Sequence, residues 1–401
     1  MSEPMVLEGL RVIDAGTMVA GPFGGTLLAD LGADVIKVER PNGGDPMREW
    51  SPMKDGRSLW WKVTARNKRL ITLDLSTPTG RELFLRLVKT ADVVIENFRP
   101  GTFERWGLSY DALRAANPKL IFVRVSGYGQ TGPYAHRPGY GTVAEGISGI
   151  PSFTGFPDKP PTLSAFPLAD ALAAVFGVMG LLAAIYERDV SGSGEGQEID
   201  VSLYEPIFRL AESQVVGYDQ LGLVKGRRGN RFEEDSPRNV YETATEGQWI
   251  TISASSDRTF ARLAAAIGRT DLIDDPLFRD NASRIENDDA LDTIIASWIK
   301  DRPIEEVLKT FENFDVVAGR IYDVRDIFND MHYRERNDIV EIADPDFGLL
   351  KMPGVFPRFS RGAGSVRWSG GALGQHNTEI YKALLGLTDD EMAAAKEEGA
   401  I

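Results

Sequence analysis

The sequence predicts an α/β protein in which a doubly wound, mostly parallel, Rossmann-like sheet forms a large domain, joined to a smaller α+β domain. Through the first half of the chain, short runs of branched apolar residues alternate with amphipathic segments, which is typical of parallel strands joined by helices. A polar stretch at residues 225–239, rich in Arg and Glu, interrupts this alternation. The 401 residues suffice for two hydrophobic cores.

These features set the expected domain bounds. We expect residues 1–224 to form the large domain, and residues 225–330 to form the small α+β domain with its linkers. The last segment, residues 331–401, is expected to return to the large domain.

The expected strands are short, apolar and bounded by polar or glycine-containing turns. In the large domain they lie at residues 10–14, 33–39, 70–75, 92–96, 120–125 and 198–203. The helices between and after them are expected at 23–31, from Thr77, from Ser109, at 171–186, and in one long helix through Tyr218. The small domain is expected to contain a strand at 249–254 and helices at 258–267 and within 288–312.

Charge and composition exclude several classes of function. The formal net charge is −14 and the isoelectric point is near 4.9, which disfavours nucleic acid and anionic membranes as partners. Because the chain has no cysteine and only three separated histidines, we expect no metal site. The first residues lack a basic stretch followed by an apolar run, so we expect a cytoplasmic protein without a membrane partner.

Residues 171–186 form an unusually apolar segment without a single charge. The run is shorter than the roughly 20 residues that span a bilayer, and it consists largely of Ala and Gly. We therefore expect a buried helix of a soluble protein.

Asp170 stands where this apolar helix is expected to begin. The positive end of the helix dipole favours an ionised carboxylate, and apolar surroundings remove the water that would weaken it. Asp170 is therefore a candidate nucleophile. Because Asp is also a common helix cap, a purely structural role for Asp170 is the alternative.

A glycine-rich turn, residues 15–25, follows the first expected strand, and Glu39 closes the second. This order is compatible with a nicotinamide-dependent oxidoreductase. However, the G-x-G-x-x-G spacing is absent, and Pro22 stands where backbone donors would meet a pyrophosphate. A tight turn alone also explains the glycines. The basic residues that could gather phosphates from separate segments are Arg40, Arg48, Lys68, Arg69 and Arg105.

An ordered set of short motifs runs through the chain. They are Val-Ala-Gly-Pro (19–22), Gly-Ala-Asp-Val-Ile-Lys-Val-Glu-Arg (32–40), Asn-Lys-Arg (67–69), Glu-Asn-Phe-Arg-Pro-Gly (96–101), Ser-Gly-Tyr-Gly-Gln-Thr-Gly-Pro (126–133), Leu-Ala-Asp (168–170) and Gly-Glu-Gly-Gln-Glu-Ile-Asp-Val-Ser-Leu (194–203). Together they resemble family III coenzyme A transferases, the family of formyl-CoA transferase and carnitine CoA-transferase. Order and spacing agree from residue 7 to about residue 215, and the stretch 374–379 is similar to the family's ending.

The resemblance implies an enzyme that moves CoA from an acyl-CoA thioester to a carboxylic acid. It implies that Asp170 is the catalytic nucleophile, which forms an aspartyl anhydride and then an aspartyl-CoA thioester. Acyl-CoA and a carboxylic acid are then substrates, and no tightly bound cofactor is implied. The family's usual assembly, an interlocked homodimer, is implied as well.

The resemblance also implies a set of contact residues. By position in the motifs, the residues that contact CoA are Val19, Ala20, Arg40, Leu73, Asn97, Phe98 and Arg105. Arginine pairs well with phosphate, and the apolar side chains suit adenine or pantetheine. Trp60, with Trp61, and Tyr140 are expected to line the acyl pocket, which favours an acid larger than formate, such as the dicarboxylates succinate or mesaconate.

The chain departs from the formyl-CoA transferase pattern in three places. Lysines of that pattern are unmatched at residues 137–141 and at Ser126, and the glycine-run loop over the active site has no counterpart. Oxalate and formate are therefore disfavoured as substrates.

Two alternatives also involve acyl-CoA. An α-methylacyl-CoA racemase-like epimerase resembles the same pattern, but its His-Asp-Ile-Asn-Tyr motif reads Tyr-Gly-Thr-Val-Ala at residues 140–144. The histidine that would move the α-proton is thus missing. The second alternative is a non-catalytic acyl-CoA-binding protein.

Overall fold

The computed structural model describes residues 3–401, which divide into two compact units. The first unit contains the described residues up to Ile150, together with Leu163–Leu223 and Tyr333–Ile401. The second contains Pro151–Thr162 and Val224–His332.

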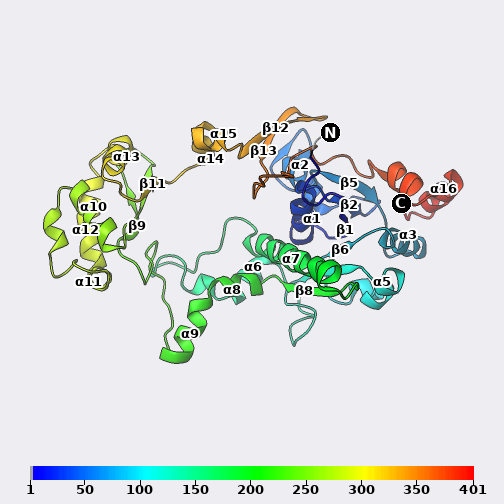
Figure 1. The fold of residues 1–401 in the computed structure, drawn as a ribbon, viewed down its shortest axis with the longest axis horizontal. Helices are drawn as coiled ribbons and strands as arrows, with labels where there is room; N and C mark the ends of the chain where they lie inside the picture. Colours follow the sequence, from blue (N-terminus) through cyan, green and yellow to red (C-terminus); the bar gives the residue numbers. More distant parts are fainter. Residues whose placement is uncertain (1–2) are drawn as a thin grey trace. The chain divides into compact units, whose positions relative to one another are not determined.

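A six-stranded sheet with the order β5-β2-β1-β6-β7-β8 forms the centre of the first unit (Figure 1). Its strands are β1 (Arg11–Asp14), β2 (Asp34–Glu39), β5 (Lys68–Thr72), β6 (Val93–Glu96), β7 (Ile121–Ser126) and β8 (Glu198–Ser202). Every neighbouring pair is parallel. The predicted fold class is confirmed, and each expected strand of this sheet lies within a few residues of its predicted place.

Helices cover both faces of the sheet because its strands are apolar on both sides. Along β1, Val12 packs into one hydrophobic cluster and Ile13 into another. The cluster around Val12 includes α1 (Ala20–Asp30) and α7 (Leu168–Tyr186). The cluster around Ile13 includes side chains of α3 (Pro78–Val88), α5 (Tyr110–Ala116), the turn η5 (Glu379–Leu384) and α16 (Asp389–Glu397). This arrangement is the doubly wound plan that the alternating sequence pattern predicts.

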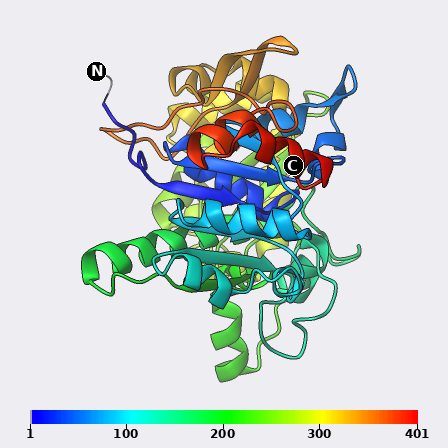
Figure 2. The same ribbon diagram turned by 90° about the vertical axis from the view of Figure 1, so that its right-hand side faces the viewer.

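The end of the chain covers the outer edge of β5, where Figure 2 shows the C-terminal helices beside the strands of the N-terminal part. The Leu70 N–H donates to His376 Nδ1 at 2.8 Å, and the Thr72 N–H donates to Asn377 Oδ1 at 2.9 Å. Tyr381 donates its hydroxyl hydrogen to the Thr72 carbonyl at 2.6 Å. These bonds satisfy an edge that would otherwise be open to pairing with another strand.

Shorter elements complete the first unit. They are η1 (Pro46–Glu49), β3 (Met53–Lys54), β4 (Arg57–Ser58), α2 (Leu59–Thr64), α4 (Thr102–Arg105), α6 (Gly141–Ile147), η3 (Glu187–Ser191), α8 (Glu205–Leu210), α9 (Glu212–Leu221), β12 (Ile339–Asp344) and β13 (Gly348–Pro353). The single long helix expected through Tyr218 is wrong, because the backbone leaves helical geometry at Ala211 (φ −92°, ψ 30°) between α8 and α9.

The second unit is an α+β structure with its own core. Its antiparallel sheet has the order β11-β10-β9. The elements are β9 (Arg238–Glu242), β10 (Trp249–Ser253), α10 (Asp257–Ala266), η4 (Thr270–Ile273), α11 (Asn281–Glu286), α12 (Asp288–Ile299), α13 (Ile304–Asn313), β11 (Ala318–Arg320) and α14 (Val324–Asn329). The short turn η2 (Ile150–Ser152) and α15 (Met331–Glu335) lie where the two units join in sequence. Ile252, Phe260 and Leu291 are fully or almost fully buried in the core of this unit.

Helix α7 is only partly buried. Together with η3 it is long and apolar enough to cross a membrane by length and composition, and 33% of its apolar window is buried. Val175, Met179, Leu182 and Tyr186 form a stripe at helical spacing and are 38–61% exposed. The expected buried helix is therefore correct for one face of α7 and wrong for the other.

The sheet order reverses between β1 and β6, because the chain proceeds outward from β1 in one direction and from β6 in the other. The loops that leave the carboxyl ends of β1 and β6 therefore diverge and open a crevice between them, the usual ligand site of this architecture.

A buried ion network joins Asp14 at the carboxyl end of β1 to Lys37 within β2, Lys68 at the start of β5 and Asp45 in the loop after β2. Lys37 Nζ lies 3.0 Å from Asp45 and 3.9 Å from Asp14, and Lys68 Nζ lies 2.9 Å from Asp14. Burial opposes the charge of Lys37, but Asp14 and Asp45 outweigh it and raise the pKa of this lysine. Lys37 Nζ also donates to the Gly16 carbonyl, so the network fixes the start of the loop after β1.

Candidate active site

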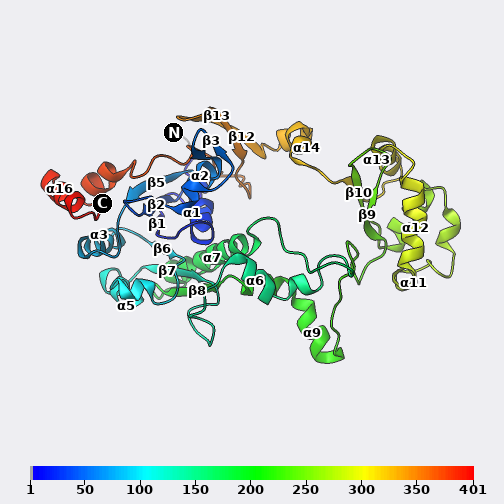
Figure 3. The same ribbon diagram turned by 180° about the vertical axis from the view of Figure 1, so that it is seen from behind.

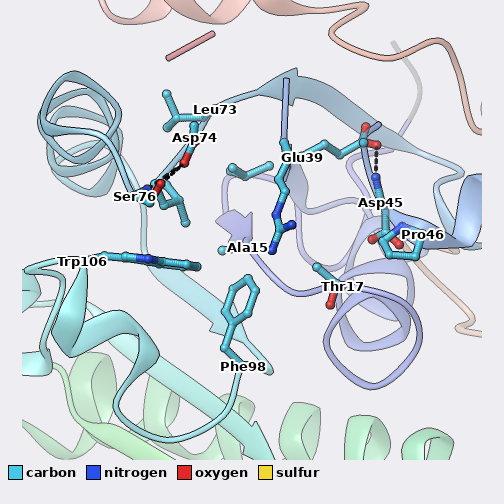
Figure 4. Close-up of a pocket in the computed structure, with 14 residues that line it drawn as sticks. Ala15, Thr17, Glu39, Asp45, Pro46, Leu73, Asp74, Ser76, Phe98 and Trp106 are labelled. Atoms are coloured by element: carbon cyan, nitrogen blue, oxygen red, sulfur yellow. Dashed lines mark hydrogen bonds between the residues drawn. The ribbon is translucent and has the colours of Figure 1, made fainter. Parts of the chain in front are cut away.

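A cavity of about 520 Å³ lies at the carboxyl ends of β1, β2 and β5 (Figure 4). The residues that line it are Ala15, Thr17, Val38, Glu39, Arg40, Gly44, Asp45, Pro46, Leu73, Asp74, Leu75, Ser76, Phe98 and Trp106. Figure 4 shows the rings of Phe98 and Trp106 together on one side of the cavity. Their centroids are 5.1 Å apart with planes inclined at 76°, an edge-to-face pair that offers apolar surface to a flat ring.

Of the described residues that line this larger cavity, Arg40 is the one cation, beside the carboxylates of Glu39, Asp45 and Asp74. Glu39 accepts hydrogen bonds from Arg48 and from the Asp45 N–H, and Asp74 accepts from Ser76. The exposed Arg40 side chain has no hydrogen bond or ion pair to any residue in the range 3–401. A free guanidinium beside aromatic surface suits a ligand that combines phosphate with a base.

A second cavity of about 250 Å³ adjoins the first, since Thr17 and Phe98 line both. Its other lining residues are Met18, Val19, Ala20, Trp50, Asn97, Arg99, Val125, Ser126, Gly127, Gly139, Tyr140, Pro167, Asp170 and Leu203. Through the smaller cavity, the larger one, which is the size of a nucleotide, is connected to Asp170.

Asp170 lies in the first turn of α7, with Pro167 in the capping position and no side-chain cap. It therefore does not occupy the capping position that the structural alternative required. Burial raises the pKa of Asp170 from 3.8 to about 6, the Asp170 N–H lowers it, and the nearby charge of Glu145 raises it further. The helix terminus was expected to favour the ionised form, but loss of water outweighs that effect here.

The loop after β1 is held in one shape where the two cavities meet. The Thr17 N–H donates to Asn97 Oδ1 at 2.7 Å, and Asn97 Nδ2 donates to the Thr17 carbonyl at 2.9 Å. Met18 has a left-handed backbone (φ 61°), and its N–H donates to Asp45 at 3.1 Å. A non-glycine residue in this conformation carries strain, which the bond to Asp45 offsets.

Most residues predicted from the sequence lie along the two cavities. Arg40, Leu73 and Phe98 line the larger one. Val19, Ala20, Asn97, Phe98, Tyr140 and Asp170 line the smaller one. The amide of Asn97 is engaged with Thr17, so that the predicted contact residue also shapes the loop.

Several predicted residues lie outside both cavity linings. Trp61 is buried, and the three further candidates for phosphate binding are ion-paired within the protein: Arg48 with Glu39, Lys68 with Asp14 and Arg69 with Asp34. Arg105 is exposed and donates to Thr102 Oγ1 at 2.9 Å. The Trp60 ring packs against Trp50, with centroids 5.7 Å apart, and it is Trp50 that lines the smaller cavity.

The structure adds Arg99 to the site, and it places there Ser126, which the sequence indicated only as a departure from the formyl-CoA transferase pattern. Arg99 lines the cavity of Asp170, is exposed, and has no side-chain hydrogen bond or ion pair within the described part of the chain. Ser126 also lines it, and its buried hydroxyl has no partner within residues 3–401. Ser126 is the last residue of β7 and Arg99 lies in the loop after β6, so their place at the carboxyl ends of strands was the available signal for them.

These features define the class of protein. Two adjoining cavities lie at the switch point of a doubly wound sheet. One has aromatic rings and an arginine that is unpaired within the described chain, and the other has a carboxyl group of raised pKa. This combination is typical of an enzyme that binds a large anionic ligand.

Comparison with known proteins identifies the family. The model of CoA-transferase family III matches residues 7–377, and the chain belongs to that family. It is 46% identical to the succinyl-CoA--D-citramalate CoA-transferase of Chloroflexus aurantiacus over 99% of this chain and 98% of that protein. It is 40% identical to the succinyl-CoA--L-malate CoA-transferase beta subunit of the same organism, over 96% of each. A crystal structure of a CAIB/BAIF family protein from Brucella suis matches with a TM-score of 0.83 at 33% identity, covering 96% of this chain and 100% of that one.

The protein is therefore an enzyme that transfers CoA between an acyl-CoA thioester and a carboxylic acid, as the sequence predicted. The named activities of these relatives are CoA transfers, which favours this function over the oxidoreductase, racemase-like and binding-only alternatives.

The raised pKa of Asp170 predicts a pH-dependent gain in stability for Asp170→Asn. Because the folded pKa lies above the unfolded value, this group stabilises the fold below about pH 4, and that contribution is lost as the pH rises through about 6. Asparagine carries no charge to bury. At pH 7.5 the free energy of unfolding of the variant should therefore exceed that of the wild type by on the order of 2 kcal/mol, and at pH 4 the two should be equal. Urea unfolding at both pH values measures this difference.

The matched control is Asp55→Asn, an exposed position in the β3–β4 turn. This variant should change the free energy of unfolding by the same small amount at both pH values. A gain for Asp170→Asn that does not depend on pH would contradict the assigned cause.

Proposed function

We propose that this enzyme transfers CoA from succinyl-CoA or a similar dicarboxylic thioester to a second dicarboxylic acid, with Asp170 as the catalytic nucleophile. The observation that carries the proposal is the placement of Asp170 in a small cavity that adjoins a larger one suited to a nucleotide. The acceptor acid of the relatives differs between them, so the dicarboxylate class is proposed rather than one acid.

The chemistry proceeds by exchange at carbonyl carbon. A carboxylate oxygen of Asp170 attacks the thioester carbonyl carbon, the C–S bond breaks, and CoA leaves as the thiolate, which gives a mixed anhydride. The thiolate then attacks the Asp170 carbonyl carbon, and the original acid leaves as a carboxylate. The acceptor carboxylate attacks the carbonyl carbon of the resulting aspartyl-CoA thioester, the C–S bond breaks, and the thiolate leaves behind a new mixed anhydride. The thiolate finally attacks the acyl carbonyl carbon of that anhydride, which forms the product acyl-CoA and releases Asp170 as the free carboxylate.

The two cavities divide the substrate between them. In this proposal the larger cavity takes the adenosine and phosphates, with Arg40 against phosphate and Leu73 and Phe98 against apolar atoms. The pantetheine arm passes Thr17 and Phe98 to the acyl group beside Asp170. Contacts of Val19, Ala20 and Asn97 with this arm are part of the proposal. Arg105, which lies outside the cavity linings, is proposed to meet the phosphates at their outer side.

Arg99 supports the dicarboxylate class. A dicarboxylic acid keeps one negative charge after its other end has reacted, and Asp170 and Glu145 repel that charge. Of the residues described as lining the smaller cavity, Arg99 alone is cationic, and it has no protein partner in the described chain. We expect it to pair with the remote carboxylate.

We further propose that the enzyme is a cytoplasmic homodimer in which a second copy covers the exposed apolar surface. The outward stripe of α7 exposes large apolar side chains, and so does α9, which buries none of its residues. Patches of this extent favour a protein interface. The net charge of −14 opposes the alternative, an anionic membrane.

The proposed nucleophile predicts a covalent adduct. Enzyme incubated with succinyl-CoA and hydroxylamine should yield a hydroxamate on the peptide that contains Asp170. Asp170→Ala should fold, give no adduct and lose about 10³-fold or more in transfer rate. Peptide mass spectrometry and a CoA-exchange assay test this, and an adduct on another residue would refute the assignment.

The role of Arg99 predicts a change in substrate preference. Arg99→Gln should raise KM for succinate by about tenfold or more and affect the monocarboxylate propionate far less, because only succinate loses a charge-assisted pair. Arg40→Gln is the matched comparison and should raise KM for the acyl-CoA with either acid. Equal losses for succinate and propionate in Arg99→Gln would contradict the pairing.

The assembly predicts a mass in solution of about twice 44.1 kDa by light scattering. Met179→Glu places a charge in the exposed stripe of α7 and should shift the protein towards monomer. A monomeric wild type, or cosedimentation of the wild type with anionic vesicles, would argue against the homodimer.

A further inference from the structure

Glu145 is a buried carboxylate close to Asp170 that does not line either cavity. It lies in α6, is 6% exposed, and accepts a hydrogen bond from the Ser164 N–H at 2.9 Å. Ser164 belongs to the segment that leads into α7, and α6 packs beside α7 (Figure 3). Glu145 thus ties α6 to the segment that delivers Asp170.

The same face of α6 also makes room for Asp170. Gly141 precedes Glu145 by four residues, one helical turn, so both positions share a face. A methyl group at position 141 would overlap Oδ2 of Asp170. The glycine therefore accommodates the carboxylate of Asp170, and the glutamate one turn later supplies a fixed negative charge behind it.

Few charged or titratable groups face Asp170. They are Glu145 from α6, Tyr140 from the segment before α6, and Arg99 from the loop after β6. The remaining described residues that line its cavity carry no charge. They come from α1, β7, the loops after β1, η1, β6 and β7, and the segments before α6, α7 and α8. Among these groups, it is the charge of Glu145 that adds to burial in raising the pKa of Asp170.

We propose that Glu145 is a positioning residue of the transfer site, which holds the segment before Asp170 and favours the acylated enzyme over the free carboxylate. The inference rests on the proposed nucleophile. Both covalent states, the anhydride and the thioester, remove the charge of Asp170, so the repulsion from Glu145 is relieved when either forms. A less stabilised carboxylate is also the stronger nucleophile.

Glu145→Gln separates the charge from the hydrogen bond, because its amide oxygen still accepts from the Ser164 N–H. The acid limb of kcat/KM, expected near pH 6 in the wild type, should move down by about half a pH unit. The fraction of enzyme trapped as aspartyl-CoA thioester at fixed substrate concentrations should fall about threefold, the equivalent of that shift. Glu145→Ala also loses the hydrogen-bond acceptor for the Ser164 N–H. Its kcat should be about tenfold lower than that of Glu145→Gln, with little change in KM for the acyl-CoA.

Glu82→Gln, an exposed site on α3, is the control and should leave both quantities unchanged. If Glu145→Gln keeps the wild-type pH profile and the wild-type fraction of thioester, the charge has no role and the inference is wrong. If Glu145→Ala alone fails to fold, Glu145→Gln still decides. A wild-type enzyme that never forms an adduct on Asp170 would instead refute the proposed mechanism, whatever the variants do.

Discussion

The site depends on the buried ion network around Asp14 at the carboxyl end of β1. Lys37 and Lys68 are almost fully buried, and each lies against Asp14, while Asp45 pairs with Lys37 and also binds the Met18 N–H. Removing one partner of such a pair would leave an uncompensated charge in a medium of low dielectric constant. The network therefore fixes the loop after β1 more strictly than apolar packing would.

This loop is what joins the two cavities. Thr17 lines both of them, and Asn97 holds Thr17 from the loop after β6, on the other side of the switch point. In the proposed mechanism, the thioester lies at the end of the extended pantetheine arm and must be placed against Asp170. A small displacement of the loop after β1 would therefore displace the reacting carbon. A rigid, charge-paired support suits that requirement better than a mobile one.

The sequence predicted the parts of this arrangement that depend on neighbours in the chain. Strand alternation, the apolar α7 and Asp170 at its start follow from local periodicity and motif order. Glu145, Arg99 and Trp50 were missed because their importance arises from spatial proximity to Asp170, which no spacing in the sequence reveals. The outward stripe of α7 was missed because a uniformly apolar helix gives no sign of which face lies outside the core. The break at Ala211 was missed because no turn residue marks it in the sequence.

The chain's end closes the outer edge of β5, and the first unit is assembled from separate stretches with the second unit between them in sequence. During synthesis on the ribosome, all residues of the second unit are therefore available before the last stretch of the first has been made. Until the turn around Tyr381 emerges, the edge of β5 has exposed backbone donors and acceptors. Folding of the catalytic unit thus waits until the segment around Tyr381 has been synthesised, and a nascent chain stalled before this point presents an edge that a chaperone would have to shield.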